Sequence, residues 1–346
     1  MRLPNYVRFR LTGPSKEQSH NSKLNGYFKR IKDKLMPILM WLASFRIVVW
    51  FHETLQNILI GIIRVGPVPR HVSFIMDGNR RYAKKCDMAI KKGHEAGGMT
   101  LLNLCYACKR IGIKCVSAYA FSIENFNRPR EEVETLTNLF SAKLDEFCER
   151  ANTLTDPLYG SRLRIVGDHS LVSADMREKI KRVERLTDNG DDFTLYICFP
   201  YTSRNDIYHT VCGSIEKSLV DSGYARSLTI AGFTRNMYLE EFSNNCDLLI
   251  RTSGHMRLSD YMLWQSHENS EILFTSTLWP DFGFIRLYLA LLKWSFFTNI
   301  QRYNEMGFSL RRKLYHALPF VDVHDPVSVD SLPSPPIAIS VTGESE

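Results

Sequence analysis

The chain carries the run His71-Val-Ser-Phe-Ile-Met-Asp-Gly-Asn-Arg-Arg-Tyr-Ala-Lys-Lys85, in which an apolar stretch passes into an acidic residue, Gly-Asn and a basic segment. The apolar part is typical of a buried strand, and ligands of open α/β sheets bind at the carboxyl ends of such strands. Glycine allows backbone to approach a phosphate closely, and the amino end of a helix attracts anions. The run therefore predicts an anion-binding turn between a strand and a helix.

Short apolar runs alternate with amphipathic stretches along the rest of the chain. Strands are predicted at residues 71–76, 115–121, 162–166, 194–199, 247–251 and 271–274, with helices between them, for example at 131–150 and 174–188. This alternation predicts an α/β fold: a single domain with a central, mainly parallel sheet flanked by helices, plus apolar helices near the amino terminus.

Composition divides the chain into segments of different character. We predict a disordered basic segment at residues 1–30, apolar and amphipathic membrane-associating helices at 31–67, a catalytic domain at 68–318 and a tail containing Pro and Ser at 319–346. The break between the second and third segments is Gly66-Pro-Val-Pro69, a strong interruption of regular structure.

The apolar segments at 35–51 and 53–65 admit two interpretations. Pro37 and Arg46 interrupt the first, which makes it marginal for a transmembrane helix. The two segments could be helices packed on the domain. They could also form an anchor at a membrane surface, with Trp41 and Trp50 at the level of the lipid headgroups. We favour the membrane-associated interpretation.

Charge and cysteine content limit the possible functions. The net charge of +7 fits nucleic acid, an anionic membrane or a phosphorylated substrate, and the position of the basic residues must decide. The chain lacks the interleaved basic and aromatic patches of a nucleic-acid binder, so we predict no nucleic-acid partner. The eight cysteines show neither a disulfide framework nor zinc spacing, which indicates a reducing compartment. No Gly-x-x-x-x-Gly-Lys-Ser/Thr motif of a nucleotidase is present.

Asp77 is an unexpected residue in an anion-binding turn. Its carboxylate would repel a phosphate unless a cation lay between them, and Mg²⁺ bridging the carboxylate and a diphosphate solves this. The alternative is that Asp77 caps a helix and that Arg80 and Arg81 lie on a solvated face. The run alone does not decide between the two.

Two further runs could build the rest of a site. Arg251-Thr-Ser-Gly-His-Met-Arg-Leu-Ser259 follows a predicted strand and resembles a second anion cradle, unless it is a surface loop with incidental arginines. Tyr119-Ala-Phe-Ser-Ile-Glu-Asn-Phe-Asn-Arg-Pro129 mixes polar and apolar side chains, as an amphiphilic substrate would require, but also fits an ordinary loop. Together these runs suggest the joining of two amphiphilic diphosphates.

The chain resembles the cis-prenyltransferase (undecaprenyl/dehydrodolichyl diphosphate synthase) family over about residues 58–318, and most closely its fungal members. The resemblance is carried by Met76-Asp-Gly-Asn-Arg-Arg-Tyr-Ala-Lys, Gly93-His-Glu-Ala-Gly, Ala118-Tyr-Ala-Phe-Ser-Ile-Glu-Asn-Phe, Gly167-Asp168, Leu249-Ile-Arg-Thr-Ser-Gly, Arg257-Leu-Ser-Asp and Leu278-Trp-Pro. It implies the cis-prenyltransferase fold and a role for each matching residue.

The implied catalytic residues are Asp77 and Asn125, and the implied metal, Mg²⁺, would be held by Asp77 and Glu271. One extra residue after Trp264-Gln265 weakens the match at Glu271. The allylic diphosphate would be bound by Gly78, Asn79, Arg80, Arg81, His94, Ser122, Phe126 and Arg128. Isopentenyl diphosphate would be bound by Arg251, Arg257 and Ser259. His255 stands where many members carry Glu, which removes any acidic role there.

The implied reaction joins isopentenyl diphosphate to farnesyl diphosphate or a related allylic diphosphate, giving the long-chain polyprenyl diphosphate that precedes dolichol. Bacterial homodimers end in an Arg-x-Gly motif that completes the neighbouring site, whereas this sequence ends Val-Thr-Gly-Glu-Ser-Glu. The resemblance therefore implies a heteromer with a Nogo-B-receptor-type subunit that supplies this motif. It also implies location at the endoplasmic reticulum membrane or the lipid droplet surface, in contact with membrane lipid and with the catalytic domain facing the cytosol.

Two alternatives to this function remain distinguishable by sequence. A non-catalytic partner subunit of the same fold would have no need of Asp77, Arg81, Arg251 and Arg257. A trans-type prenyl synthase would need Asp-rich metal motifs on helices, and the chain has none.

Overall fold

The computed structural model describes residues 46–220, 224 and 228–317 of the chain. They divide into two compact units that meet between Ser295 and Phe296, and the larger unit holds the whole sheet. The predicted segments 1–30 and 319–346 lie outside the described residues, and so does the first part of the 31–67 segment. The division between the units falls inside the predicted catalytic range of 68–318.

Six parallel strands form one sheet in the order β3-β4-β2-β1-β5-β6. The strands are β1 (His71–Ile75), β2 (Cys115–Tyr119), β3 (Ser161–Val166), β4 (Phe193–Cys198), β5 (Leu248–Arg251) and β6 (Glu271–Phe274). The α/β fold and all six predicted strands are confirmed, with ends that differ by at most two residues. The fold class was predictable because buried parallel strands are nearly continuous apolar runs.

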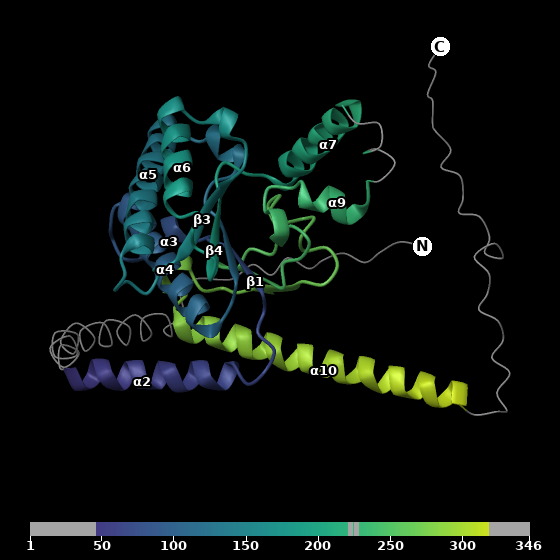
Figure 1. The fold of residues 1–346 in the computed structure, drawn as a ribbon. Helices are drawn as coiled ribbons and strands as arrows, with labels where there is room; N and C mark the ends of the chain where they lie inside the picture. The colour runs from purple at the N-terminus through teal and green to yellow at the C-terminus, as the bar shows by residue number, and fades with distance from the viewer. Residues whose placement is uncertain (1–45, 221–223, 225–227, 318–346) are drawn as a thin grey trace, which may run out of the picture. The chain divides into compact units, whose positions relative to one another are not determined.

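Helices connect the strands and cover the sheet (Figure 1). Those described are α2 (Arg46–Ile63), α3 (Asn79–Lys85), α4 (Ile90–Ile111), α5 (Arg130–Asn152), α6 (Ala174–Leu186), α7 (Ser203–Val220), α9 (Ile230–Arg235) and α10 (Phe284–Ala317). Short 3₁₀ turns are η1 (Ile123–Asn127), η2 (His169–Leu171), η3 (Glu240–Phe242) and η4 (Trp279–Asp281). Among these described helices, none is both long and apolar enough to span a membrane.

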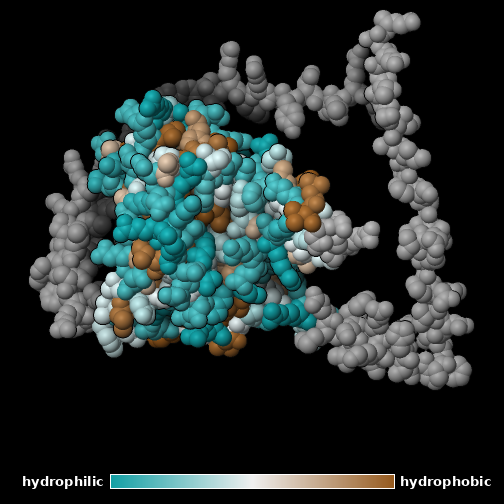
Figure 2. Space-filling view, turned by 45° about the horizontal axis from the view of Figure 1, so that its top comes forward, coloured by the Kyte–Doolittle hydropathy of each residue, from teal (hydrophilic) through white to brown (hydrophobic). Residues whose placement is uncertain are grey.

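The pleat of the sheet sends alternate residues into two separate cores. Val72 and Phe74 of β1 join the core beneath α4, α5 and α6, whereas Ile75 joins the core on the opposite face. On β4, Leu195 and Ile197 likewise face the first core, and Tyr196 faces the second. This alternation follows from the two-residue period of a strand and fixes which residues face α4 and α5. Figure 2 shows a mostly hydrophilic outer surface on one side of the molecule, with apolar residues in separate patches.

Candidate active site

A cavity of about 750 Å³ opens at the carboxyl edge of the sheet and continues between the sheet, α4 and α5. β1 has β2 and β5 as its neighbours, so the segments that follow these strands meet at this edge. These segments belong to the three sequence runs described above, which contain Asp77, Ser122 and Arg251. Of the predicted site residues, the cavity is lined by Asp77, Gly78, Asn79, Arg80, Arg81, His94, Ser122, Asn125, Arg128, Arg251, Arg257 and Ser259.

Asp77 lies directly after β1 and faces Arg251 at the end of the neighbouring strand. Arg251 Nη2 donates to Asp77 Oδ2 at 3.0 Å, and Arg81 Nη2 lies 3.7 Å from Asp77 Oδ1. The backbone of Asp77 is fixed as well, because its carbonyl accepts from Thr252 Oγ1 at 2.7 Å and from the Trp279 amide at 3.1 Å. The Asp77 side chain remains 29% exposed toward the cavity. Asp77 is therefore a fixed carboxylate between arginines and not a simple helix cap.

Gly78 and Gly97 let α3 and α4 approach each other closely around Asn79. Gly78 has φ 115°, a left-handed conformation that L side chains rarely adopt. A Cβ atom on Gly97 would lie only 2.3 Å from Asn79 Oδ1 and 2.9 Å from Trp279 Cδ1. Asn79 Nδ2 donates to the Met76 carbonyl at 3.2 Å, which holds the amide in place. The turn after β1 is thus packed too tightly for a side chain at position 97.

Three buried polar atoms of the cavity lining have no hydrogen-bond partner within the described part of the chain. They are Asn79 Oδ1, His94 Nε2 and Arg251 Nε. Buried polar atoms are rarely left unpaired, so unpaired atoms in a cavity indicate where a polar ligand would bind. All three belong to residues predicted to bind a diphosphate.

Arg80 and Arg128 converge on one carboxylate beside His94. Arg128 Nη1 donates to Glu132 Oε1 at 3.0 Å, and Arg80 Nη1 lies 3.7 Å from the same oxygen. Burial is the largest cause that lowers the pKa of His94 to about 4; the charges of Arg128 and Arg80 act in the same direction, and Glu132 opposes them. His94 is therefore neutral at pH 7 and would contribute hydrogen bonding rather than charge.

The second cradle is built around the buried side chain of Arg251, which is 3% exposed. Arg251 Nη1 donates to Ser259 Oγ at 2.8 Å and also to the carbonyl of Arg257. Ser253 and Ser259 have φ of 79° and 55°, so this loop departs from regular structure on both sides of the arginine contacts. Arg251 thereby joins the loop that carries Arg257 and Ser259 to Asp77.

The third run forms η1 at the mouth of the cavity. Ser122 Oγ accepts from the Glu124 amide at 3.2 Å, and Asn125 Oδ1 accepts from the Ser122 amide at 3.3 Å, a capping box that fixes both side chains. Phe126 does not line the cavity. Its ring packs edge-on against Phe121 at 5.0 Å and supports the wall from outside.

The deeper part of the cavity is apolar. It is lined by Leu101, Leu102, Leu136, Leu139, Phe140, Leu144, Phe147, Leu163, Leu195, Ile197 and Phe199. Phe140 and Phe199 stack at 4.0 Å between ring centroids. Phe199 directly follows β4, and Ile197 and Leu195 lie at alternate positions within it. This wall therefore runs from the carboxyl edge toward the amino edge of the sheet.

Glu271 is not brought to Asp77, contrary to the predicted metal pair. It is the first residue of β6 and pairs with Leu248, at the amino end of β5, whereas Arg251 at the carboxyl end pairs with Phe274. Its carboxylate accepts from Lys293 Nζ at 2.7 Å. The parallel register therefore places Glu271 at the opposite end of the strand from the cavity mouth, and we remove it from the metal site.

Two residues of the site were not predicted from the sequence. Glu132 lies four residues after Arg128, and this spacing on a helix could have signalled the ion pair. Trp279 was noted only as part of a motif. Its indole donates to the Gly97 carbonyl at 2.8 Å and its backbone amide to Asp77, which links η4, α4 and the turn after β1.

Comparison with known proteins defines the class of this fold and site. Residues 75–302 match the family described as "Putative undecaprenyl diphosphate synthase". The chain belongs to this cis-prenyltransferase family and is a prenyl-transferring enzyme.

Particular relatives narrow the position within the family. The chain is 58% identical to the dehydrodolichyl diphosphate synthase complex subunit SRT1 of Saccharomyces cerevisiae, over 91% of this chain and 92% of the relative. It is 37% identical to the human dehydrodolichyl diphosphate synthase complex subunit DHDDS, over 74% of each chain. The predicted resemblance to the fungal members is confirmed.

Solved structures agree with the fold. Lavandulyl diphosphate synthase from Lavandula x intermedia, crystallised with dimethylallyl diphosphate, matches with a TM-score of 0.60 and 29% identity, over 66% of this chain and 95% of that chain. A probable undecaprenyl diphosphate synthase from Campylobacter jejuni matches with a TM-score of 0.53 and 28% identity, over 66% and 96%.

Proposed function

We propose that this enzyme condenses isopentenyl diphosphate onto farnesyl diphosphate, or a related allylic diphosphate, to make the long-chain polyprenyl diphosphate precursor of dolichol. The observation that carries this proposal is the meeting of Asp77 and Arg251 at 3.0 Å, which joins two arginine-bearing cradles at one end of an apolar cavity. Two charged heads and one hydrocarbon chain require this combination of surfaces.

The residues around Asp77 fit a magnesium ion shared with a diphosphate. Mg²⁺ is commonly held by one or two carboxylates, with substrate phosphates and water completing its shell. Asp77 offers one carboxylate that faces the cavity. Among the described residues, no group of three or more His, Cys, Asp or Glu side chains lies close enough together to hold a metal ion. The ion would supply positive charge that stabilises the leaving diphosphate.

The chain's own residues would do the rest of the work at the allylic end. Arg80, Arg81 and Arg128 bind the allylic diphosphate, with Gly78 and Asn79 presenting backbone and amide groups to it. As the allylic carbon–oxygen bond breaks, its electron pair moves to the diphosphate, and these fixed donors stabilise the added charge. Asn125 and Ser122 position the reacting end, and neutral His94 donates or accepts a hydrogen bond without adding charge.

The second substrate lies in the Arg251 cradle. Arg257 and Ser259 bind its diphosphate together with Arg251, which orients the isopentenyl double bond toward the allylic carbon. The π electrons form the new carbon–carbon bond, and transfer of a proton to the released diphosphate gives the new double bond. Each cycle adds five carbons to the prenyl chain in the apolar part of the cavity, and burying these carbons stabilises the bound product by roughly 4 kcal/mol.

A partner subunit completes the proposed enzyme. The Saccharomyces and human relatives are named as subunits of complexes, which supports assembly of this chain with a second protein. The described surface also offers an exposed apolar stripe on α7, formed by Tyr208, Val211, Ile215 and Leu219. We propose a Nogo-B-receptor-type partner that contributes an Arg-x-Gly motif, and a location at the endoplasmic reticulum membrane or lipid droplet surface, facing the cytosol.

Incorporation of radiolabelled isopentenyl diphosphate tests the proposal. The full chain, purified with its partner, should elongate farnesyl diphosphate in Mg²⁺, stop when EDTA removes the metal and recover when Mg²⁺ returns. Asp77→Asn should lower the rate on the order of a hundredfold, because a preorganised electrostatic group is lost. Asp281→Asn is the matched control, since its carboxylate pairs with Lys85 at 2.9 Å outside the cavity lining.

Retention of elongation by Asp77→Asn would contradict the assigned role of Asp77. The non-catalytic alternative makes the opposite prediction for the whole chain, because elongation by the complex would then be indifferent to both Asp77→Asn and Arg251→Met.

A further inference from the structure

Arg204, in the first turn of α7, joins the two loops that carry the proposed substrate cradles. Its Nη2 donates to Glu124 Oε1 at 3.0 Å, and its Nε donates to Asp260 Oδ2 at 2.7 Å. Glu124 belongs to η1, at the allylic side of the cavity mouth. Asp260 directly follows Ser259 of the isopentenyl cradle. One guanidinium thus spans both sides of the site without lining the cavity itself.

The start of α7 also fixes Asp260, through two backbone amides. The Arg204 amide donates to Asp260 Oδ1 at 3.1 Å, and the Ser203 amide donates to the Asp260 carbonyl at 2.7 Å. Ser259 and Asp260 both have positive φ, of 55° and 57°, a conformation that needs support from its surroundings. Tyr119 adds a hydrogen bond from its hydroxyl to the Ser259 carbonyl at 3.2 Å. The position of Ser259 therefore depends on contacts with α7.

Glu124 and Asp260 are poorly placed for an enzyme that binds two diphosphates. A carboxylate close to a phosphate repels it, and Glu124 lines the cavity. Arg204 lies against both carboxylates and neutralises them in part. The side chains of Arg204 and Glu124 are 73% and 63% exposed, and such exposed ion pairs contribute little to folding stability, whereas Asp260 is only 11% exposed. Substrate binding therefore explains the reach of Arg204 from Asp260 to Glu124 better than folding does.

We propose that Arg204 is a positioning residue whose guanidinium holds Glu124 and Asp260 and screens their charge from the two diphosphates. This inference rests on the proposed assignment of the two substrate cradles. It predicts an effect on the KM values of both substrates, because both carboxylates lose their partner together when the arginine is removed.

The test uses the full chain purified with its partner subunit and measures KM and kcat for farnesyl and isopentenyl diphosphate. Arg204→Gln should raise both KM values about tenfold while kcat changes less, since charge near a binding site acts on association with a charged ligand. Arg204→Lys should have an intermediate effect, because one ammonium lacks the fork that reaches both carboxylates. Arg130→Gln is the matched control, as this exposed arginine pairs with Glu134 on its own helix and does not line the cavity.

A charge-rescue variant separates screening from mere support. In Arg204→Gln combined with Glu124→Gln and Asp260→Asn, the repelling charges are gone, so both KM values should return to within about threefold of the wild-type values. Loss of support alone would not be repaired by these changes. The inference is overturned if Arg204→Gln, or a soluble Arg204→Lys where Arg204→Gln fails to fold, leaves both KM values unchanged. It is also overturned if the triple variant is no better than the single one.

The wild-type complex keeps this test distinct from that of the proposed function. Absence of elongation by the wild-type complex would refute the proposed substrates. Elongation by the wild type, with no response to Arg204→Gln, would refute only the role of Arg204.

Discussion

Arg251 illustrates how a single buried charge organises the site. A buried guanidinium is costly unless each of its groups finds a partner. Arg251 donates to Asp77, to Ser259 and to the Arg257 carbonyl, while its Nε remains without a partner within the described residues. The incomplete pairing leaves capacity for one more acceptor in the cavity. The proposed diphosphate would supply that acceptor.

His71 should make folding stability depend on pH. Burial lowers its pKa to about 4, against opposing contributions from Asn245, Asp247 and Phe242. Between pH 6.5 and 4 the unfolded chain binds a proton that the folded chain does not, so stability falls as pH falls through this window. The loss from this residue is about 3 kcal/mol when complete.

Urea unfolding between pH 7.5 and 4.5 measures this dependence. His71→Asn should flatten the slope of unfolding free energy against pH, and the comparison variant is the exposed His267→Gln. An equally steep slope in His71→Asn would show that other groups control the acid sensitivity. The same window contains His94, whose pKa is also about 4, so the slope should become smaller but not vanish.

At the residue scale, sequence reasoning succeeded where a side chain follows a strand. Asp77 and Arg251 each end an apolar run, and parallel strands bring such positions to one edge. Glu271 was misplaced because a match to a family motif gives a position in the sequence and does not say at which end of a strand that position lies. Arg204 received no role, because its partners, Glu124 and Asp260, are distant in sequence and only the fold brings them together.

At the scale of elements, the contact between α3 and α4 depends on the absence of a side chain at Gly97. Gly97→Ala should push a methyl group into Asn79 and Trp279, which costs about 1–3 kcal/mol of stability and raises the KM for the allylic substrate. Chemical denaturation and steady-state kinetics measure the two effects.

The neighbouring Gly98→Ala is the matched control. A Cβ atom there would lie 3.1 Å from Lys143 Cε, the movable end of a flexible side chain, and alanine favours a helix interior over glycine. The control should therefore keep wild-type activity and lose no stability. Equal losses in both variants would mean that α4 merely resists substitution, without a specific contact at position 97.

The elements themselves were predictable because their signals are local. Most of the strands are apolar runs, and β3 alternates arginine with buried residues. α6 begins one residue after Ser173, whose hydroxyl accepts from the Met176 amide as an N-cap. The strand order could not be predicted, since the paired residues of β1 and β5, such as Val72 and Leu248, are 176 positions apart and no local pattern records that choice. The 3₁₀ turns that shape the cavity mouth could not be predicted from the sequence either.

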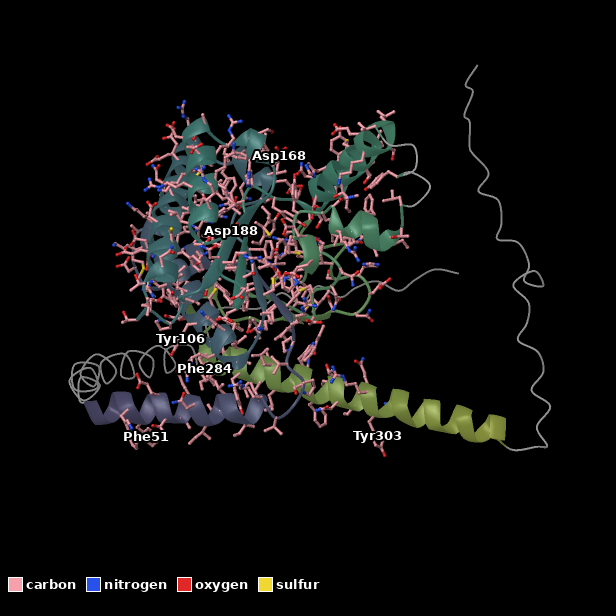
Figure 3. The ribbon with its side chains drawn as sticks, in the orientation of Figure 1. Phe51, Tyr106, Asp168, Asp188, Phe284 and Tyr303 are labelled. Carbon is pink, nitrogen blue, oxygen red and sulfur yellow. The ribbon has the colours of Figure 1, made fainter. Side chains whose placement is uncertain are left out.

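At the scale of the whole larger unit, α2 and the deep end of the cavity lie toward the same end of the sheet. Arg110, in the last turn of α4, donates to Asn57 of α2, near the start of β2. Figure 3 shows Asp168, just past the carboxyl end of β3, at the end opposite to α2, and Phe51 extending from α2 away from the sheet. The apolar wall therefore runs from the reacting heads toward the α2 end.

The exposed face of α2 should bind membranes. It consists of Trp50, Phe51, Leu55, Ile58 and Ile62, all substantially exposed. Replacing Phe51 and Ile58 together by Ser should reduce co-sedimentation with phosphatidylcholine–phosphatidylserine vesicles severalfold, because apolar area available to the lipid interface is lost. Leu154→Ser, at an exposed position between α5 and β3, is the control and should bind as the wild type does. Unaltered sedimentation of the α2 variant would favour the alternative that this helix packs on protein.

The shared ladder of β1 and β5 has a mechanical consequence. Phe74 pairs with Ile250 and Ile75 with Arg251, so the spacing of the two reactive ends is set by neighbouring strands about 4.8 Å apart and not by a hinge between lobes. A spacing that is set by backbone hydrogen bonds between two strands does not increase gradually on warming. On heating, enzyme activity should therefore be lost abruptly, at the temperature at which the sheet unfolds and not below it.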